Sequence, residues 1–173
     1  MTTNNTHATD WAVAPVPITG PEAATLLRRY YTELVSRFYG RPTDDAEVSA
    51  VLAEEPSDDL VPPTGEFLAV RLAGAPARGV PVGCVGLRVL DAHTMELTRM
   101  YVGPEARGQG VAGLLIGAAE TLARGTFHAD TIRLDTRKDL VEARALYAKH
   151  GYREIARYNT SPYADHWFEK RLR

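Results

Sequence analysis

The sequence predicts an α+β fold with one central sheet, and three observations lead to that prediction. Apolar residues recur at helical spacing in four segments, and six other segments have the residue types and bounding turns of strands. Their order is two helices, three strands, a helix, a strand, a helix and two strands. The 173 residues suffice for one domain with a sizeable core, but not comfortably for two.

The chain is expected to begin with a flexible leader over residues 1–17, which is polar at its start and ends in Pro15-Val-Pro17. Its start has neither the basic region nor the apolar run of a secretion signal. Helical spacing begins after Thr19-Gly-Pro-Glu22, where Thr19 is a candidate cap and Pro21 suits a first helical turn. This first helix is expected to end at Gly40-Arg-Pro42.

The remaining elements follow in order. A short helix is expected around 44–54, and then a loop through Pro56 and Pro62-Pro63. A turn is expected over 74–79, and Gly151 is a natural left-handed cap for the last helix. The predicted strands are 67–72, 82–90, 94–102, 131–135, 152–158 and 165–172, and the two later helices are 110–124 and 140–150.

Composition excludes several classes of protein. The 20 Lys and Arg against 22 Asp and Glu give a net charge of −2, which does not favour nucleic acid or an anionic membrane as a partner. Cys84 is the only cysteine, so no internal disulfide forms, and the five histidines lack metal-ligand spacing. No run of 18 apolar residues occurs. We therefore expect a cytoplasmic protein with no bound metal.

The sharpest local pattern lies between a predicted strand and the helix over 110–124. There, Gly108 and Gly110 flank Gln109 directly before the helix. Glycines lack a Cβ, so backbone N–H groups can approach an anion, and the helix start adds unpaired donors and partial positive charge. The pattern predicts a pyrophosphate cradle. A plain tight turn is the alternative, whereas a nucleotide P-loop would need a lysine and a different spacing.

Two wider patterns resemble the GNAT superfamily of N-acetyltransferases, from roughly Phe67 to the C-terminus. The first is similar to motif A of the family and comprises Arg107-x-x-Gly110-x-Ala112 after Glu96–Val102. The second is similar to motif B and comprises Leu134-Asp135-Thr136, Ala143, Leu146-Tyr147 and Gly151-Tyr152. One departure is Leu140, which stands where many members carry Asn and leaves one cofactor contact open.

The resemblance implies a fold, a domain organisation and a co-substrate. The implied fold has a central, mostly antiparallel sheet of six to seven strands flanked by about four helices. Residues 18–173 would form a single acetyltransferase domain, with acceptor-binding helices and loop over 18–66 and an acetyl-CoA-binding core over 67–173. Acetyl-CoA would be the co-substrate, and no metal is implied.

The resemblance also implies how the co-substrate is held. The backbone N–H groups of residues 107–112 would hold the pyrophosphate, namely those of Arg107, Gly108, Gln109, Gly110, Val111 and Ala112. The backbone of Met100, Tyr101 and Val102 would pair with pantetheine like an added strand. Family members splay this strand from its neighbour, which leaves N–H groups free to polarise the acetyl carbonyl. Arg107 would brace the loop or contact phosphate.

Two side chains are candidates for proton transfer. Tyr147 is the candidate general acid, because a phenol is protonated at neutral pH and can supply a departing thiolate; the alternative is an aromatic that merely lines the thiol channel. Glu96 is the candidate general base through water, and the alternative is a carboxylate paired with an arginine such as Arg99. Regular alternation would put Glu96, Thr98, Met100 and Val102 on one face, barring a bulge.

The expected reaction moves an acetyl group to a primary amine of a small polar metabolite, such as an amino acid, a polyamine or an aminoglycoside-like compound. Tyr30, Tyr31, Phe38 and Tyr39 can line an acceptor pocket, with the loop from Tyr158 to Tyr163 opposite. An acidic rim would attract a cationic amine, whereas a solvated surface is the alternative. The carboxylates concerned are Asp44, Asp45, Glu47, Glu54, Glu55, Asp58, Asp59 and Glu66.

Other readings stay open at this point. A protein N-terminus or a lysine is an alternative acceptor, and a non-catalytic acyl-CoA-binding module is an alternative class. Homodimers are common among relatives, although nothing in the sequence requires one. Cys84 lies among Val82, Val85 and Leu87, where a small buried apolar side chain is the ordinary explanation rather than an acyl-carrying nucleophile.

Overall fold

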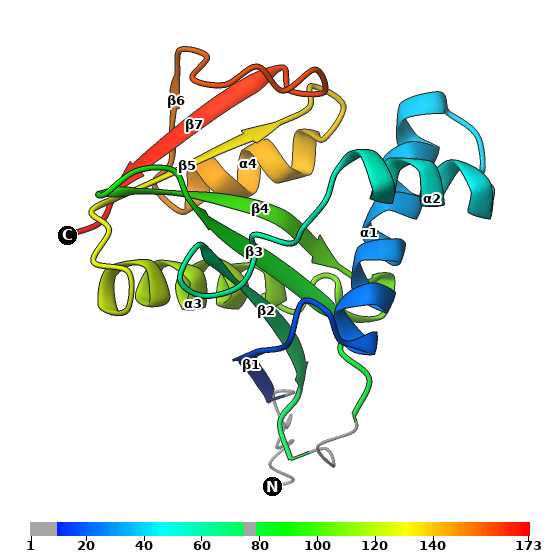
Figure 1. Ribbon diagram of the computed structural model, residues 1–173, viewed down its shortest axis with the longest axis horizontal. Helices are drawn as coiled ribbons and strands as arrows, with labels where there is room; N and C mark the ends of the chain where they lie inside the picture. Colours follow the sequence, from blue (N-terminus) through cyan, green and yellow to red (C-terminus); the bar gives the residue numbers. More distant parts are fainter. Residues whose placement is uncertain (1–9, 75–78) are drawn as a thin grey trace, which may run out of the picture.

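The structure, a computed structural model, describes residues 10–74 and 79–173. Within these ranges the chain forms a seven-stranded sheet in the order β1-β2-β3-β4-β5-β7-β6 (Figure 1). All neighbouring strands are antiparallel except β4 and β5. The strands are β1 (Trp11–Pro15), β2 (Gly65–Leu72), β3 (Gly83–Val89), β4 (Thr94–Val102), β5 (Thr131–Thr136), β6 (Arg153–Ile155) and β7 (His166–Arg171).

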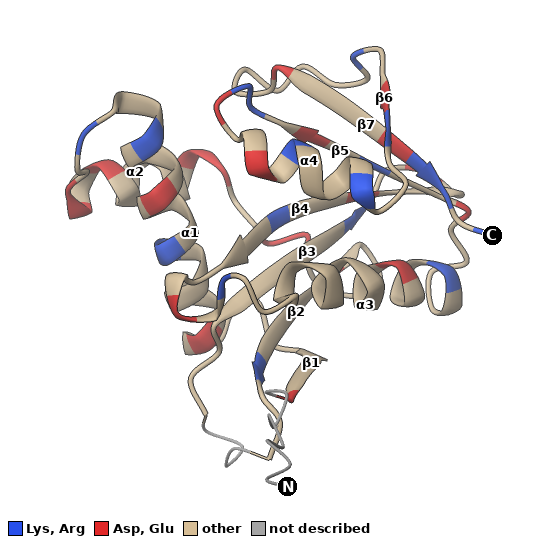
Figure 2. Ribbon diagram, turned by 180° about the vertical axis from the view of Figure 1, so that it is seen from behind, with Lys and Arg blue, Asp and Glu red and all other residues tan. Residues whose placement is uncertain are grey.

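Four α-helices accompany this sheet: three pack on its two faces, and the fourth packs on another helix (Figures 1 and 2). The helices are α1 (Pro21–Tyr39), α2 (Asp45–Glu54), α3 (Val111–Gly125) and α4 (Val141–Lys149), and a short 3-10 turn spans Pro104–Ala106. One apolar cluster joins the sheet to α3 and Tyr147 of α4, and a second joins the opposite face to α1. The predicted α+β class, the mostly antiparallel sheet and the four helices are confirmed.

The predicted leader is wrong in its second half, because Trp11–Pro15 forms β1 and pairs with β2. The prolines do not prevent this, since an edge strand needs backbone donors on one side only. Residues 1–9 of the leader lie outside the described residues, as do residues 75–78 of the predicted turn. None of the helices in the described part of the chain is long and apolar enough to cross a membrane.

The first two helices begin and end for local reasons. Gly20, not Thr19, is the N-cap of α1, with Pro21 in the first turn, and Gly40 ends the helix with φ +66°. Asp44 caps α2 by accepting from the Glu47 N–H, while the Glu47 side chain accepts from the Asp44 N–H. This reciprocal capping box satisfies two donors at the helix start.

A bulge in β4 interrupts the alternation that the sequence predicts. Gly86 pairs with Thr98, but Cys84 pairs with Tyr101, so β4 carries one extra residue there. Arg99 takes the left-handed conformation with φ 55°, which is uncommon for a side chain with a Cβ. The bulge therefore reverses which face each later residue of β4 occupies.

The pairing of β4 with β5 is short, and it leaves an opening in the sheet. Parallel register joins only Thr94–Glu96 to Thr131–Arg133, although β4 continues to Val102 and β5 to Thr136. Parallel neighbours need a crossover connection, which α3 provides here. The two strands therefore separate beyond Glu96, toward the start of α3.

Candidate active site

A cavity of about 590 Å³ occupies the opening between β4 and β5. Its walls come from α1, the end of β4, the loop before α3, the end of β5 and α4. Eight of the predicted site residues line it, namely Glu96, Met100, Tyr101, Val102, Arg107, Gly108, Ala112 and Tyr147. The structure thus brings the two predicted motifs, which lie far apart in the sequence, to one cavity.

The loop before α3 presents backbone donors at one end of this cavity. Gly108 and Gly110 both have positive φ, 74° and 76°, and Gly110 is the N-cap with no side-chain cap bond. The Leu114 N–H bonds to the Gly110 carbonyl at 3.2 Å, so the amides of the preceding turn project from the helix end. Acidic and basic residues of α3 lie only toward its C-terminal end (Figure 2). This uncharged start suits an anion.

Arg107 braces the loop. Its Nε donates to the Val102 carbonyl at 3.0 Å, and its terminal nitrogen donates to Glu33 of α1 at 2.6 Å. The first contact fixes the loop against the end of β4, and the second ties it to α1. This is one of the two roles that the sequence analysis expects for the residue.

The bulge in β4 separates side chains that regular alternation would place together. Glu96 and Thr98 lie on the α1 face, opposite Arg88 and Gly86. Beyond the bulge, Met100 and Val102 pack against the cluster on the α3 face, and Tyr101 belongs to the cluster on the α1 face. The bulge is the exception under which the sequence does not place Glu96 on one face with Met100 and Val102, and the extra residue Arg99 separates them.

Tyr147 lies on α4 at the cavity wall, with only 5% of its surface exposed. Its ring packs edge-on against Tyr152, with centroids 5.8 Å apart. Burial raises the pKa of Tyr147, with smaller contributions from Tyr30 and Asp135. The hydroxyl therefore keeps its proton at neutral pH, as a general acid requires.

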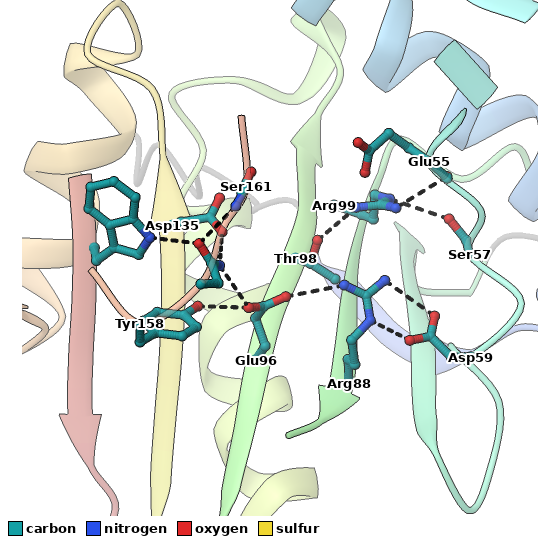
Figure 3. Close-up of polar contacts among 12 residues, drawn as sticks. Glu55, Ser57, Asp59, Arg88, Glu96, Thr98, Arg99, Asp135, Tyr158 and Ser161 are labelled. Carbon is teal, nitrogen blue, oxygen red and sulfur yellow. Dashed lines mark hydrogen bonds and ion pairs between the residues drawn. The ribbon is translucent and has the colours of Figure 1, made fainter. Parts of the chain in front are cut away.

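Glu96 has three partners in the structure (Figure 3). Arg88 donates to one oxygen at 3.2 Å, and the Tyr158 hydroxyl donates to the other at 2.7 Å, with Asn159 at 3.5 Å. The arginine paired with Glu96 is thus Arg88 rather than Arg99. Arg99 instead lies over the Tyr31 ring, 5.5 Å from its centroid.

A second carboxylate, Asp135, faces Glu96 across the opening (Figure 3). It accepts from the Asn159 side chain at 2.6 Å. Burial raises the pKa of Asp135, and the negative charge of the nearby Glu96 raises it further. The hydrogen bond from Asn159 acts in the opposite direction and lowers this pKa. A carboxyl with a raised pKa in a cavity is a candidate for proton transfer. Asp135 belongs to the second motif, but no pattern in the sequence around it indicates this role.

Most carboxylates of the acidic stretch lie away from the cavity, and only Glu55 lines it. Asp44 and Glu47 cap α2, and Asp59 is ion-paired with Arg88. Apart from Glu55, the acidic stretch therefore does not line the cavity, and capping or ion pairing engages Asp44, Glu47 and Asp59. The aromatic wall is present, and it consists of Tyr30, Tyr31, Phe38, Tyr39 and Tyr163.

Cys84 is fully buried, and its thiol donates to the Arg99 carbonyl at 3.3 Å. Burial raises the pKa of this thiol, so it stays protonated. It does not line the cavity. The side chain acts as a small apolar residue beneath the bulge, as the sequence predicts.

A sheet opened between two parallel strands, with backbone donors at one end and carboxylates at the other, is typical of enzymes that transfer an acyl group from coenzyme A. The sequence matches the model of the Acetyltransferase (GNAT) family over residues 27–152. The chain belongs to this family, and it is an N-acetyltransferase that acts with acetyl-CoA. No curated protein matches the chain.

Solved structures from several organisms share the fold. A Klebsiella pneumoniae protein whose name assigns it to the acyl-CoA N-acyltransferases has 26% identity and a TM-score of 0.67, over 94% of this chain and 97% of that one. The PaiA N-acetyltransferase of Thermoplasma acidophilum, solved with coenzyme A, has 18% identity and a TM-score of 0.70, over 94% and 99%. Spermidine N-acetyltransferase of Vibrio cholerae, solved with CoA and spermine, has 16% identity and a TM-score of 0.63, over 94% and 95%.

Proposed function

We propose that the protein transfers the acetyl group of acetyl-CoA to a primary amine of a small polar metabolite by direct attack. The observation that carries this proposal is the single cavity that joins the glycine loop, Tyr147 and the two carboxylates Glu96 and Asp135. Its volume of about 590 Å³ lies in the range of sites for small molecules.

The loop and β4 fit the co-substrate. Positive φ at Gly108 and Gly110 turns the amides of the loop outward, where they would hold a pyrophosphate. The edge of β4 beyond Glu96 is free of β5, so the backbone of Met100 and Val102 would pair with the pantetheine arm. On this proposal residues 67–173 hold acetyl-CoA, and α1 with the segment up to Glu55 forms the acceptor side.

The reaction needs proton transfer at two places. The acceptor must lose its ammonium proton before its nitrogen bonds to the acyl carbon, and the sulfur must gain a proton as the carbon–sulfur bond breaks. Glu96, acting through water, and Asp135 are the carboxylates placed to take the first proton. Tyr147 is the buried phenol placed to give the second.

The cavity lining favours a cationic acceptor. The carboxylates of Glu55, Glu96 and Asp135 line the cavity, as do aromatic rings from α1, and both suit a cation. The Vibrio cholerae relative solved with spermine is consistent with this class. An amino acid, a polyamine or an aminoglycoside-like compound is the proposed acceptor.

The test is a panel of amines assayed with acetyl-CoA by thiol release, on the wild type and Tyr147→Phe. The panel contains amino acids, polyamines, aminoglycosides, and peptides with a free N-terminus or a lysine. Acetylation of a small amine, slowed in the variant, supports the proposal. Preference for peptides would indicate that the acceptor is a protein. Absence of acetyl-CoA binding in calorimetry would refute the proposal entirely.

A further inference from the structure

Asn159, in the loop between β6 and β7, connects the two carboxylates at the cavity. Its Nδ2 donates to Asp135 at 2.6 Å and lies 3.5 Å from Glu96. Its Oδ1 accepts from the Trp167 indole N–H at 2.8 Å and from the Ser161 backbone N–H at 3.3 Å. Because two N–H groups face the oxygen, the amide nitrogen must face the carboxylates.

The two carboxylates depend on Asn159 to different degrees. Glu96 also receives hydrogen bonds from Arg88 and Tyr158. Asp135 has no such support, because Asn159 is its one side-chain donor among residues 10–74 and 79–173. A hydrogen bond to a charged, buried group is worth more than one to a neutral group.

We propose that Asn159 is a positioning residue for proton transfer, which holds the Asp135 carboxylate ionised and oriented beside Glu96 at the cavity. Trp167 on β7 is the second part of this device, because it fixes which end of the amide faces the carboxylates. The inference rests on the proposed function, since it assigns Asn159 to the step in which the acceptor amine loses its proton.

Asp135 needs the hydrogen bond from Asn159 to stay ionised, because most of its surroundings favour the protonated acid. Burial and the neighbouring Glu96 and Glu55 favour the protonated acid, whereas Asn159 and Arg99 favour the carboxylate. Loss of the Asn159 donor removes the larger of the two stabilising influences, so the proton would leave Asp135 only at higher pH. The titratable groups that face Asp135 are Glu96 and Arg99 of β4, Glu55 after α2, Tyr30 of α1, Tyr147 of α4, and Tyr158 of the loop.

The experiment is a pH titration of the Asp135 carboxyl by ¹³C NMR in the full chain, with the signal assigned from its loss in Asp135→Asn. We compare the wild type with Asn159→Leu, which removes the donor, and with Asn159→Asp, which adds a third carboxylate. Trp167→Phe removes the indole N–H and leaves Asn159 in place. His166→Gln, on the same strand with its side chain paired to Glu154, is the matched control.

The titration midpoint of Asp135 should be lowest in the wild type. It should rise in the order Trp167→Phe, Asn159→Leu and Asn159→Asp. Loss of one charge-assisted hydrogen bond should raise the proton affinity of Asp135 about tenfold in Asn159→Leu. His166→Gln should titrate like the wild type. The proposal is overturned if Asp135 titrates alike in the wild type and in folded Asn159→Leu.

The outcome is separable from the proposed function, because the titration requires neither acetyl-CoA nor an acceptor. Calorimetry with acetyl-CoA on the same variants tests the proposed function separately. Unchanged titration with normal acetyl-CoA binding would remove the role of Asn159 alone. A shifted midpoint in a chain that does not bind acetyl-CoA would leave the hydrogen-bond network intact and refute the transferase proposal.

Discussion

The guanidinium of Arg88 on β3 lies 3.2 Å from the carboxylate of Glu96, its register partner on β4. The same guanidinium contacts Asp59 (Figure 3). Arg88 thus balances two carboxylates, of which Glu96 is only 10% exposed. Removing the arginine would leave a nearly buried charge without its cation.

We predict that Arg88→Met lowers the free energy of unfolding by about 2 kcal/mol, since breaking a partly buried pair strands its partner. Urea denaturation measures the change. Arg41→Met is the control, because the Arg41 guanidinium is about half exposed in its pair with Glu47. That variant should lose clearly less stability than Arg88→Met, because solvent screens its exposed pair. Equal losses in the two variants would contradict the importance of burial at Glu96.

On the proposed mechanism Tyr147→Phe should lower kcat about 100-fold and leave the Kd for acetyl-CoA unchanged, because only the proposed proton donor is lost. Tyr152→Phe is the matched control. Its hydroxyl donates to Glu120 at 3.2 Å and the residue does not line the cavity. We expect this control to lose about 1 kcal/mol of stability and to keep its turnover. Turnover that falls equally in both variants would make Tyr147 a packing residue.

Gly110→Ala should cost about 1 kcal/mol of stability and weaken acetyl-CoA binding about tenfold, because a Cβ strains the left-handed conformation that turns the loop amides outward. Gly40→Ala provides the comparison. Gly40 also has positive φ, 66°, and a Cβ at either position would meet no atom within 4 Å. Its strain cost should be similar, with affinity unaffected. Calorimetry that shows equal affinities for the two variants would argue against the cradle.

The raised pKa of Asp135 predicts two opposite effects of pH. On the proposed mechanism activity needs the carboxylate, so kcat/KM should rise with pH through a limb above the ordinary aspartate value of 3.8. In Asp135→Asn we expect kcat/KM to fall about 100-fold and this limb to disappear.

Stability should respond in the other direction. The folded chain binds this proton more tightly than the unfolded chain does, so the ionised carboxylate costs stability above the folded pKa. Asp135→Asn should therefore be more stable than the wild type at pH 7. This difference should vanish below the unfolded pKa, where both states carry the proton. Chemical denaturation at pH 7 and in acid checks the sign.

Variants of Glu55 and Asp45 test whether a cationic acceptor is attracted by a carboxylate that lines the cavity or by the acidic stretch as a whole. Glu55→Gln should raise the KM for a cationic acceptor about threefold, because a carboxylate that lines the cavity is lost. Asp45→Asn should leave the KM unchanged, since the Asp45 side chain is fully exposed on α2 and outside the cavity lining. Steady-state kinetics at two salt concentrations gives the comparison. A KM that is unchanged in both variants would contradict a role for charge attraction in acceptor binding.

Local patterns predicted the elements that are stabilised locally. Periodicity placed the strand over 94–102 within its observed bounds, and the glycine pair located the start of α3. Composition alone could not separate a capping carboxylate such as Asp44 from one that lines a cavity, because both are acidic residues near a helix. The edge strand β1 was missed because its pairing partner, β2, lies more than fifty residues away in the chain.

The parts of the site that were missed depend on the tertiary structure. The left-handed conformation of Arg99 is imposed by the register of β3 against β4, which the sequence near Arg99 does not encode. Asp135 was visible within a motif, but its raised pKa depends on burial and on Glu96 of the neighbouring strand. Asn159 acquires a role only when β7 brings Trp167 to its amide oxygen.

The position of β7 has a consequence for biosynthesis. His166–Arg171 lies between β5 and β6, so a segment near the end of the chain is an interior strand of the sheet. During translation, β5 has no neighbour on that side until this segment leaves the ribosome, and Trp167 arrives with it. The pairing of β5 with β7 and the contact of Trp167 with Asn159 should therefore both form only after this segment has been synthesised. A messenger that stops before codon 166 should yield an aggregation-prone chain with an open sheet edge.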